Sequence, residues 1–364
     1  MRLSYRTRRT LKRLGIVSLI LLLMFIIAWF CSVVFLERYV VYTRDGAMLD
    51  LSVSANDILG ERVTDRTSTT NITIHYNEGS DAVNMSDELF QLNGYYIDIE
   101  TLKTDIAGVW DLLEPLSSNT PIMIDLKGGY GSAYYSSTLP GIITSSEVSV
   151  ATVDELIGHM NERNFYTIAR ISAFRDYNYG LNHVPSGLMH VNGKGLWPDE
   201  GHCYWLDPTK EDTIKWIVSI IKEIKNMGFD EVVLTDFRFP DSDMYRFNGD
   251  KDAALVEAAT KILNECGDRK FTVSFAVSSH EFALPEGRTR MYLEKVAATN
   301  VGAVASKVSE TVSDPELRLV FVAQTNDTRF DAYSAMRPIT VAPVLEAQKA
   351  AAAKQAQQEQ LNGK

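Results

Sequence analysis

Carboxylates and cations stand directly after two short apolar runs, where they could do chemistry. Asp236 follows EVVLT, with Arg238 two positions later, and Asp125 follows PIMI, with Lys127 at the same spacing. Residues two apart on a strand point to the same face of a sheet, so each pair shares a face. An unpaired carboxylate is costly to remove from water. Asp236 is therefore either a catalytic or substrate-orienting group, or a structural residue held by Arg170 or Arg238.

A third run, FYTIARIS, contains Arg170 and leads to Asp176, and a long connection, residues 177–208, follows it. Connections of this length in compact domains are usually functional or disordered, and this one is too aromatic for disorder. Rings beside carboxylates suit a sugar, which presents CH patches and hydroxyl groups. The residues of interest are Trp197, Asp199, His202, Tyr204 and Trp205. In the alternative interpretation, Trp205 packs inward as a plug. For Asp207 we favour a cap on the following helix.

The elements that must position these residues alternate from residue 92 onward, with short apolar runs followed by helical segments. This pattern is typical of parallel βαβ units. Strands are expected at 94–99, 121–126, 165–172, 231–237, 271–277, 301–306 and 317–323, and helices at 101–116, 153–164, 210–228 and 251–267. An eighth strand is expected near 338–344; otherwise the barrel is incomplete.

The predicted fold class is α/β, a (β/α)8 TIM-type barrel over residues 92–345, because about 250 residues are typical of that fold. A doubly wound open sheet is the alternative, but no glycine-rich phosphate loop follows the first predicted strand. In TIM-type barrels the site lies at the carboxyl ends of the strands, which is where the charged residues stand.

The amino-terminal region predicts one membrane anchor. Six basic residues and no acidic one occur in residues 1–14, and residues 15–36 contain no charge. About 20 apolar residues cross a bilayer, and the basic flank stays in the cytoplasm. A cleaved signal peptide is the alternative, although its apolar stretch is usually shorter, roughly 7–15 residues. We expect an extracytoplasmic stalk at 37–91, an extracytoplasmic barrel, and a disordered Ala/Gln-rich tail at 346–364.

Charge and cysteine content exclude several classes of protein. The net charge is −11, and without the six basic residues of the first fourteen, 30 basic residues face 47 acidic ones. Such an acidic chain lacks the basic footprint of a nucleic-acid binder. Cys31, Cys203 and Cys266 have no metal-binding spacing, so Cys203 and Cys266 are expected as free thiols, with a disulfide as the alternative. No His, Asp or Glu cluster has ligand spacing, and we expect no metal and no cofactor.

Two segments together resemble a known family. They are YTIARISAFRD (166–176) and GLWPDEGHCYWLDPTKEDTIKWIVSIIKEIKNMGFDEVVLTDFRFP (195–240). The motifs IAR-x-x-x-F-x-D, LW-x-D, W-x-DP, GFDE and RFP resemble the bacterial Putative glycosyl hydrolase domain family, a barrel group distantly similar to alpha-amylase-like glycosidases. The strong resemblance spans residues 165–240, and a weaker one extends over 94–282.

The resemblance implies that Asp236 is the nucleophile-like carboxylate. It also implies a cleft lined by Asp125, Lys127, Arg170, Trp197 and Asp199. The sequence departs from the family pattern at Ala276, where members usually carry a fifth-strand carboxylate. It also departs at Gly128 and Gly129, where acidic residues usually follow the lysine. The family's sixth-strand aromatic motif is missing too, and AVASKVSET stands there instead.

Glycoside hydrolysis normally requires two carboxylates. The candidates for the partner of Asp236 are Glu281, Asp199, Asp125 and Asp176, and Glu281 is the nearest substitute because it follows the fifth predicted strand. Glycan contacts are expected from Asp125, Lys127, Arg170, Asp176, Trp197, Asp199, Trp205 and Arg238.

The expected function is that of a single-pass cell-membrane protein whose barrel acts on an envelope or extracellular polysaccharide. The first alternative is a catalytically degenerate barrel that binds glycan or a cell-envelope partner without hydrolysis. The second is a purely structural scaffold.

Overall fold

The structure is a computed structural model that describes residues 40–43, 46–49, 89–277, 282–343 and 347. The chain divides into two compact units, Met1–Asn77 and Glu78–Lys364. In the first unit, β1 (Val40–Thr43) pairs antiparallel with β2 (Gly46–Leu49). The second unit contains all the other described helices and strands.

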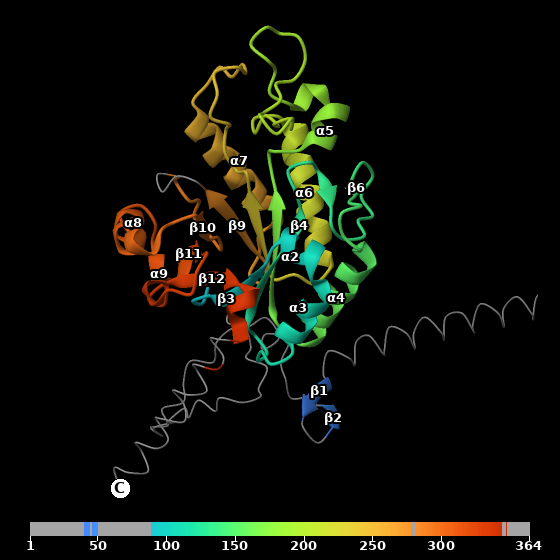
Figure 1. Cartoon of the computed structure of the whole chain (residues 1–364), viewed down its shortest axis with the longest axis vertical. Coiled ribbons are helices and arrows are strands. Elements are labelled where there is room, and N and C mark those ends of the chain that lie inside the picture. The colour runs from blue at the N-terminus through green and yellow to red at the C-terminus, as the bar shows by residue number, and fades with distance from the viewer. Residues whose placement is uncertain (1–39, 44–45, 50–88, 278–281, 344–346, 348–364) are drawn as a thin grey trace, which may run out of the picture. The chain divides into compact units, whose positions relative to one another are not determined.

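Eight parallel strands of the second unit close into a barrel (Figure 1). They are β3 (Asn93–Ile97), β4 (Pro121–Lys127), β7 (Tyr166–Ser172), β8 (Glu231–Thr235), β9 (Thr272–Val277), β10 (Met291–Glu294), β11 (Leu319–Val322) and β12 (Ser334–Pro338). The ring closes because β3 pairs with both β4 and β12. The short strands β5 (Ser132–Ala133) and β6 (Ile143–Thr144) extend the sheet beside the end of β4. The predicted barrel is confirmed, and it is closed.

Helices connect most of the strands. They are α2 (Ile99–Thr104), α3 (Ile106–Leu113), α4 (Val150–Glu162), α5 (Tyr177–Asn182), α6 (Glu211–Asn226), α7 (Lys251–Cys266), α8 (Val301–Val308) and α9 (Pro315–Arg318). Short 3-10 turns lie at η2 (Val184–Ser186), η3 (Ala298–Asn300), η4 (Thr328–Phe330) and η5 (Ile339–Val341). The predicted stop of α6 is confirmed at Gly228, whose φ of +93° suits a residue without a side chain.

Two strand predictions in the last third of the chain were wrong. Residues 301–306 lie in α8, where Val301, Ala305 and Val308 are buried at helical spacing. The sixth strand is instead β10, which is short and stands between charged residues. The eighth strand begins at Ser334, four residues before the predicted position. A short apolar run of small residues does not distinguish a strand from a buried helix, which explains the first error.

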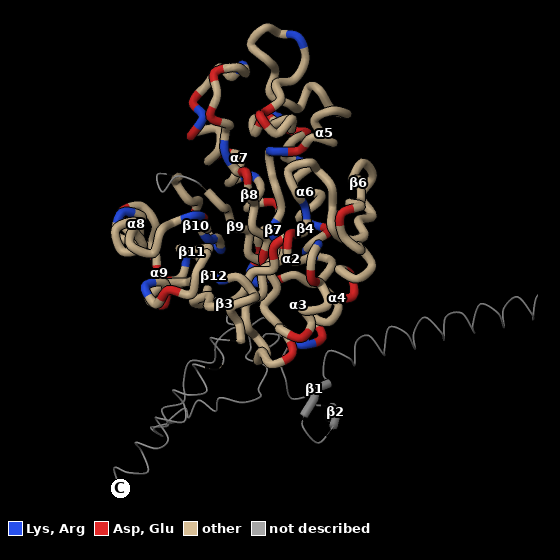
Figure 2. Tube along the Cα trace, in the orientation of Figure 1, with Lys and Arg blue, Asp and Glu red and all other residues tan. Residues whose placement is uncertain are grey.

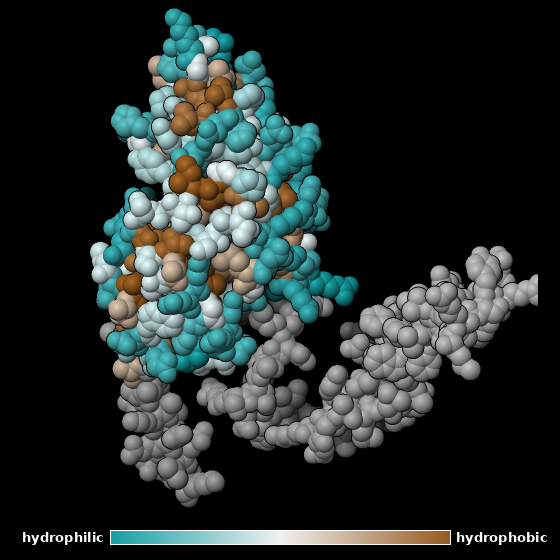
Figure 3. All heavy atoms as spheres, turned by 90° about the vertical axis from the view of Figure 1, so that its right-hand side faces the viewer, coloured by the Kyte–Doolittle hydropathy of each residue, from teal (hydrophilic) through white to brown (hydrophobic). Residues whose placement is uncertain are grey.

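The core has two layers. Inside the barrel, one cluster of buried side chains includes Tyr166, Ile168, Val233, Tyr292 and Val320. The larger cluster lies between the strands and the surrounding helices. On the face shown in Figure 3, apolar residues occur as separate patches among hydrophilic ones. Acidic and basic residues are intermixed along the described chain (Figure 2), which agrees with the lack of a basic footprint.

The predicted anchor, stalk and tail fall largely outside the described residues. Among the helices that the structure describes, none is long and apolar enough to cross a membrane. Cys203 and Cys266 are buried free thiols, as predicted. Burial raises the pKa of each thiol to about 11.

A fully buried ion pair holds the amino-terminal end of the barrel interior together. Arg290 Nη1 binds Glu231 Oε2, and both side chains have no exposed surface. Glu231 also accepts hydrogen bonds from the Tyr166 hydroxyl at 2.9 Å, the Ser274 hydroxyl at 2.6 Å and the Tyr292 hydroxyl at 3.0 Å. Three neighbouring strands and the segment before β10 therefore converge on one carboxylate.

Replacing Arg290 with Met should lower the free energy of unfolding by about 3–5 kcal/mol, because Glu231 is left as an uncompensated buried charge. Urea unfolding followed by circular dichroism measures the change. The double variant R290M/E231Q should recover much of the loss, since it removes both charges. Lys215→Ala, which breaks the exposed Lys215–Glu211 pair on α6, is the control and should leave the midpoint unchanged. An equal loss for R290M and K215A would contradict the prediction.

Candidate functional site

The carboxyl ends of the strands from β3 to β10 surround a cavity of about 820 Å³. Its walls include Asp125, Lys127, Arg170, Asp236, Arg238 and Glu294. The first five were predicted site residues, so the structure brings together side chains that are up to 113 positions apart in the sequence. The cavity lies at the end of the barrel where the fold class places its sites.

Asp236 follows β8 directly and lines the cavity in a half-buried position. Its φ of +50° is in the left-handed region, which carries a cost for a residue with a side chain and is often found at functional sites. Oδ2 lies 2.7 Å from the Ser172 hydroxyl. That hydroxyl also lies 2.8 Å from the Arg175 carbonyl oxygen, and its single proton serves one acceptor at a time. Within the described residues, no ion pair neutralises Asp236.

Asp125 is held in a network that fixes its position. Arg170 Nη1 lies 2.8 Å from Asp125 Oδ1, while the Tyr96 hydroxyl and the Ile99 amide donate to Oδ2 at 2.8 and 2.9 Å. Arg170 Nη2 also binds Glu294 Oε1 at 2.7 Å. Burial disfavours the charge on Arg170, but the carboxylates, Asp125 foremost, raise its pKa above the ordinary value. Burial, and then Asp125, raise the pKa of Tyr96, so this phenol remains a donor.

Lys127 and Asp176 form a second buried pair. Lys127 Nζ lies 2.9 Å from Asp176 Oδ2, and both side chains are about 1% exposed. Lys127 also donates to the Ser172 carbonyl oxygen at 2.8 Å. Asp176 accepts from the Tyr179 amide at 2.8 Å, which caps α5, and from Trp216 Nε1 at 3.2 Å. Asp176 is fully buried, so it anchors Lys127 and does not reach a ligand in the cavity.

The aromatic connection supports the cavity wall. Trp205 is 2% exposed, and the Arg238 guanidinium lies over its ring at 4.9 Å, which agrees with the plug interpretation. Trp205 Nε1 donates to Asp199 Oδ2 at 2.9 Å, and Arg175 Nε donates to the same oxygen at 2.6 Å. Burial opposes ionisation of Asp199, but the hydrogen bonds from Arg175, the Cys203 amide and Trp205 lower its pKa to about 2.

Two further residues of this connection lie away from the cavity walls. Trp197 is half-buried and packs on Tyr245, with ring centroids 5.5 Å apart. The prediction that Asp207 caps the following helix was wrong, because the N-cap of α6 is Lys210. Asp207 Oδ1 instead accepts from the amide and the hydroxyl of Thr209, at 2.9 and 2.7 Å. Asp207 stands three residues before the N-cap of α6.

Two acidic residues of the cavity wall were missed by the sequence analysis. Glu294 ends β10, the strand that was not predicted. Asp241 lies just beyond the RFP motif, is exposed, and has no ion pair within the described ranges. Ala276 lines the wall where family members usually carry a carboxylate. Glu281 lies outside the described residues.

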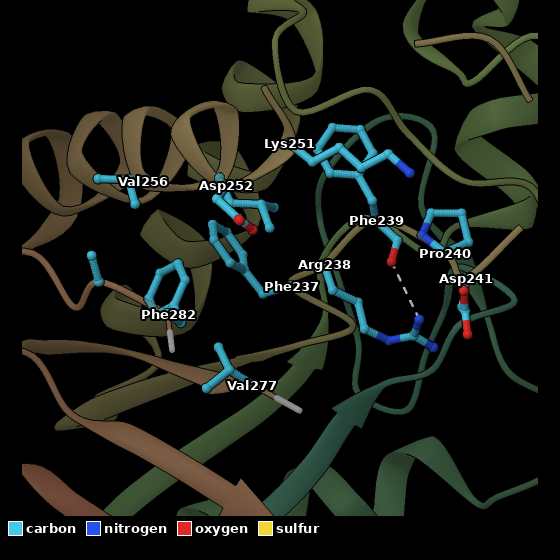
Figure 4. A pocket seen from close by; sticks show the side chains of 12 residues that line it. Phe237, Arg238, Phe239, Pro240, Asp241, Lys251, Asp252, Val256, Val277 and Phe282 are labelled. Atoms are coloured by element: carbon cyan, nitrogen blue, oxygen red, sulfur yellow. Dashed lines mark hydrogen bonds between the residues drawn. The ribbon is translucent and has the colours of Figure 1, made fainter. Parts of the chain in front are cut away.

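A smaller pocket of about 340 Å³ adjoins the cavity on the side of β8 and β9. Figure 4 shows its mainly apolar lining, with Phe237, Phe239 and Phe282 around it. Arg238 and Asp241 line both this pocket and the main cavity. Arg238 Nη1 lies 3.4 Å from the Phe239 carbonyl oxygen. Among the described residues, no group of three or more His, Cys, Asp or Glu side chains could hold a metal ion.

A closed parallel barrel with a carboxylate-lined cavity at the carboxyl ends of its strands defines a TIM-type barrel, the fold class in which functional sites lie at that end. The chain belongs to the Putative glycosyl hydrolase domain family, whose model matches residues 96–292. The match begins within β3 and ends within β10, and it includes all the cavity residues named above except Glu294. No curated protein matches the chain.

Solved structures with the same fold include glycoside hydrolases. The PgaB (BpsB) glycoside hydrolase domain from Bordetella bronchiseptica is 11% identical, with a TM-score of 0.51 over 71% of this chain and 98% of that one. A hypothetical protein from Ruminiclostridium thermocellum is 24% identical, with a TM-score of 0.44 over 50% and 96%. An exo β-N-acetylglucosaminidase from Vibrio harveyi is 10% identical, with a TM-score of 0.44 over 64% and 41%. Of these three, the PgaB domain alone has a TM-score above 0.5, and at 11% identity that likeness concerns the fold alone.

Replacing Asp199 with Asn should lower the melting temperature at neutral pH, because the Arg175 pair is lost. The folded-state pKa of Asp199 is about 2, below its ordinary value of 3.8. Its ionisation therefore stabilises the protein above pH 3.8, and this stabilisation is lost as the pH falls through about 2. Melting curves of both forms between pH 2 and pH 6 should converge toward pH 2. A constant difference over that range would contradict the assignment.

Proposed function

We propose that the chain hydrolyses glycosidic bonds of an envelope or extracellular polysaccharide and that Asp236 is the carboxylate that acts at the anomeric carbon. One observation carries the proposal. Asp236 lies in the cavity with one oxygen held by Ser172 and with no cation bound to it in the described part of the chain. Family membership and the barrel fold support the same class of reaction.

The other predicted aspartates are less suited to this role. Asp125 is paired with Arg170, Asp176 with Lys127, and Asp199 with Arg175. A carboxylate that is held by a guanidinium or ammonium has its charge neutralised and its lone pairs occupied. Asp236 keeps its charge available, and the Ser172 hydroxyl orients it.

A second carboxyl group must protonate the leaving oxygen of the glycosidic bond. It acts as the general acid whether the first carboxylate is a nucleophile or a general base. Glu294 is bound to Arg170, so it is less suited to donating a proton and better suited to stabilising the positive charge that develops on the sugar. Asp241 carries no such pair within the described ranges and shares the cavity wall with Asp236. We assign the acid to Asp241, with Glu281 as the alternative that the sequence favours.

Glycan binding without hydrolysis is the second candidate function. Ala276 favours it, since an alanine stands on the cavity wall where the family pattern carries a carboxylate. In that case the same cavity holds a sugar chain through its charged and polar groups, and the protein serves as an anchored lectin-like module.

The cellular setting forms part of the proposal. A basic segment at residues 1–14 and an uncharged run at 15–36 would place the barrel outside the cytoplasm, anchored in the cell membrane by a single span. Kinship with amylase-like glycosidases is likewise proposed from motif resemblance.

Asp236→Asn should abolish hydrolysis while leaving glycan affinity within a few-fold, because the amide keeps the shape of the side chain but loses its charge. Asp241→Asn should lower kcat by roughly 10²–10⁴-fold on natural linkages, as expected when a general acid is removed. With a dinitrophenyl glycoside, whose leaving group needs no proton, D241N should regain most of its rate and D236N should not. Hydrolysis of a polysaccharide panel and of aryl glycosides measures these rates.

Asp243→Asn is the matched control, since Asp243 is an exposed aspartate close to Asp241 that lines neither pocket. Its rates should equal those of the unmodified protein. Equal turnover by D236N and the unmodified protein excludes the proposed mechanism. Glycan binding with no product from any substrate favours the lectin-like alternative.

Protease treatment of intact cells should digest the barrel while protecting residues 1–14. A tag at either end of the chain, followed by immunoblotting of membrane fractions, makes the measurement. Replacing the uncharged run with a cleavable signal peptide should move the barrel from the membrane fraction to the soluble extracytoplasmic fraction. A barrel that resists protease until the cells are lysed contradicts the orientation.

A further inference from the structure

Besides the pocket on the side of β8 and β9, a second pocket, of about 350 Å³, adjoins the Asp236 cavity. The two share Gly128 and Tyr134 as wall residues, so they are neighbouring parts of one surface depression. The other walls of the second pocket are Tyr130, Ser132, Ser145, Glu147, Tyr177 and Asn178. Neither the family match nor the predicted site residues assign a role to this pocket.

The Gly128–Gly129 pair makes room for the pocket wall. A Cβ atom at Gly128 would lie 2.3 Å from the Tyr134 hydroxyl, and one at Gly129 would lie 2.5 Å from Arg175 Nη1. Side chains at these two positions would displace a tyrosine from the shared wall and an arginine from the neighbouring ion pair. The family pattern has acidic residues at these positions. The two glycines leave room for Tyr134 and Arg175, which gives the departure a structural explanation.

The pocket is built on a turn that is fastened to α5. The Tyr177 and Asn178 amides donate to the carbonyl oxygens of Gly129 and Tyr130, at 3.3 and 3.2 Å. The buried Lys127–Asp176 pair joins the same two segments. The site consequently rests on a fixed backbone.

Two tyrosine rings face the opening from this frame. Tyr177 stacks on Tyr204, with centroids 5.3 Å apart and an interplanar angle of 7°. Tyr130 is 56% exposed and lies 6.4 Å from Tyr177, ring centroid to ring centroid. Its hydroxyl donates to the Gly201 carbonyl oxygen at 3.1 Å, which ties the ring to the aromatic connection. Because its hydroxyl is hydrogen-bonded, the exposed ring of Tyr130 is held in place and can serve as a contact surface.

The chemistry of the lining fits a sugar ring. Tyrosine faces accept the CH patches of a pyranose, and the Ser132, Ser145 and Asn178 side chains offer donors and acceptors to its hydroxyls. Burial raises the pKa of Tyr134 to about 12, so this phenol stays a donor at the shared wall. The charged wall residue is Glu147, which also binds Lys103 at 2.7 Å. Because Lys103 offsets the charge of Glu147 and no cation lines the pocket in the described part of the chain, the lining offers no partner to uronic or sulfated sugars and fits neutral or amino sugars.

We propose that this tyrosine pocket is a further sugar subsite, which holds the ring next to the two rings whose glycosidic bond lies at Asp236. The inference rests on the proposed function and narrows its substrate class to oligosaccharides or polysaccharides of neutral or amino sugars that are bound over at least three consecutive rings. A glycoside of a single terminal sugar would leave the subsite empty.

The test measures binding by the full chain that carries D236N, so that no probe is consumed. The probes are oligosaccharides of two to six glucose, mannose, galactose, N-acetylglucosamine or glucosamine units, titrated by calorimetry. For the sugar series that binds, affinity should rise at least tenfold from the dimer to the tetramer. Adding Tyr130→Ala or Tyr177→Ala should remove roughly five- to tenfold of the tetramer affinity, the range expected for an aromatic contact, and little of the dimer affinity.

Two matched variants control the test. Tyr130→Phe keeps the ring and should retain most of the tetramer affinity. Leu181→Ala removes a 49%-exposed apolar side chain of α5 outside the pocket and should change nothing. Thermal melting of each variant reports its folding, and Tyr130, being largely exposed, should be replaceable without loss of stability.

The results separate the two proposals. Length-dependent, tyrosine-dependent binding without hydrolysis by the unmodified protein keeps the subsite and overturns the proposed enzymatic function. If the rate of hydrolysis depends neither on the length of the oligosaccharide nor on the two tyrosines, the enzymatic function stands and the proposed subsite is overturned. Binding of none of these probes overturns the assignment of a neutral or amino sugar.

Discussion

The buried Lys127–Asp176 pair is the constraint on which the candidate site depends. Two charges with almost no exposed surface are stable only because they are paired with each other and hydrogen-bonded to further groups. Through that pair, the end of β4 is fixed to the segment after β7, to the first turn of α5 and, through Trp216, to α6. Lys127 also holds the Ser172 carbonyl oxygen, and the Ser172 hydroxyl reaches Asp236. The position of the proposed catalytic carboxylate is therefore set by a chain of contacts that begins at a buried lysine.

The sequence was sufficient to predict the barrel where strands are long and apolar and where helices carry a regular stripe. β4, β7, β8 and β9 are such strands, and α6 is such a helix. Prediction failed where this signal is weak. Only four residues form β10, with charged residues on both sides, and its pairing with β9 and β11 defines it. The apolar run at 301–306 is short enough to fit either a strand or a helix, and packing against the barrel decides for a helix.

The sequence predicted which types of residue stand at the strand ends, but it did not predict the role of each residue. Sequence position places Asp125, Asp176 and Asp236 at the same mouth, and it cannot say which carboxylate meets a cation. That is decided by side chains that arrive from distant segments, as Arg170 does at Asp125. Glu294 escaped notice because its strand did. In the sequence, Gly128 is only a departure from the family pattern, and the location of Tyr134 gives it a structural meaning.

In this barrel, the paired carboxylates stabilise the structure, whereas the unpaired Asp236 is the proposed reactive group. Paired carboxylates such as Asp125 fix the walls, because breaking any one pair would strand a buried or half-buried charge. Asp236 is left unpaired within the described chain, on a left-handed backbone that the surrounding pairs hold in place. In the proposed function, this preorganised charge acts on the sugar without further rearrangement. Under the same proposal, recognition of the rest of the sugar chain falls to loops. Since loops change without disturbing the barrel, the turn that carries Tyr130 is where substrate preference would diverge while the carboxylate frame stays the same.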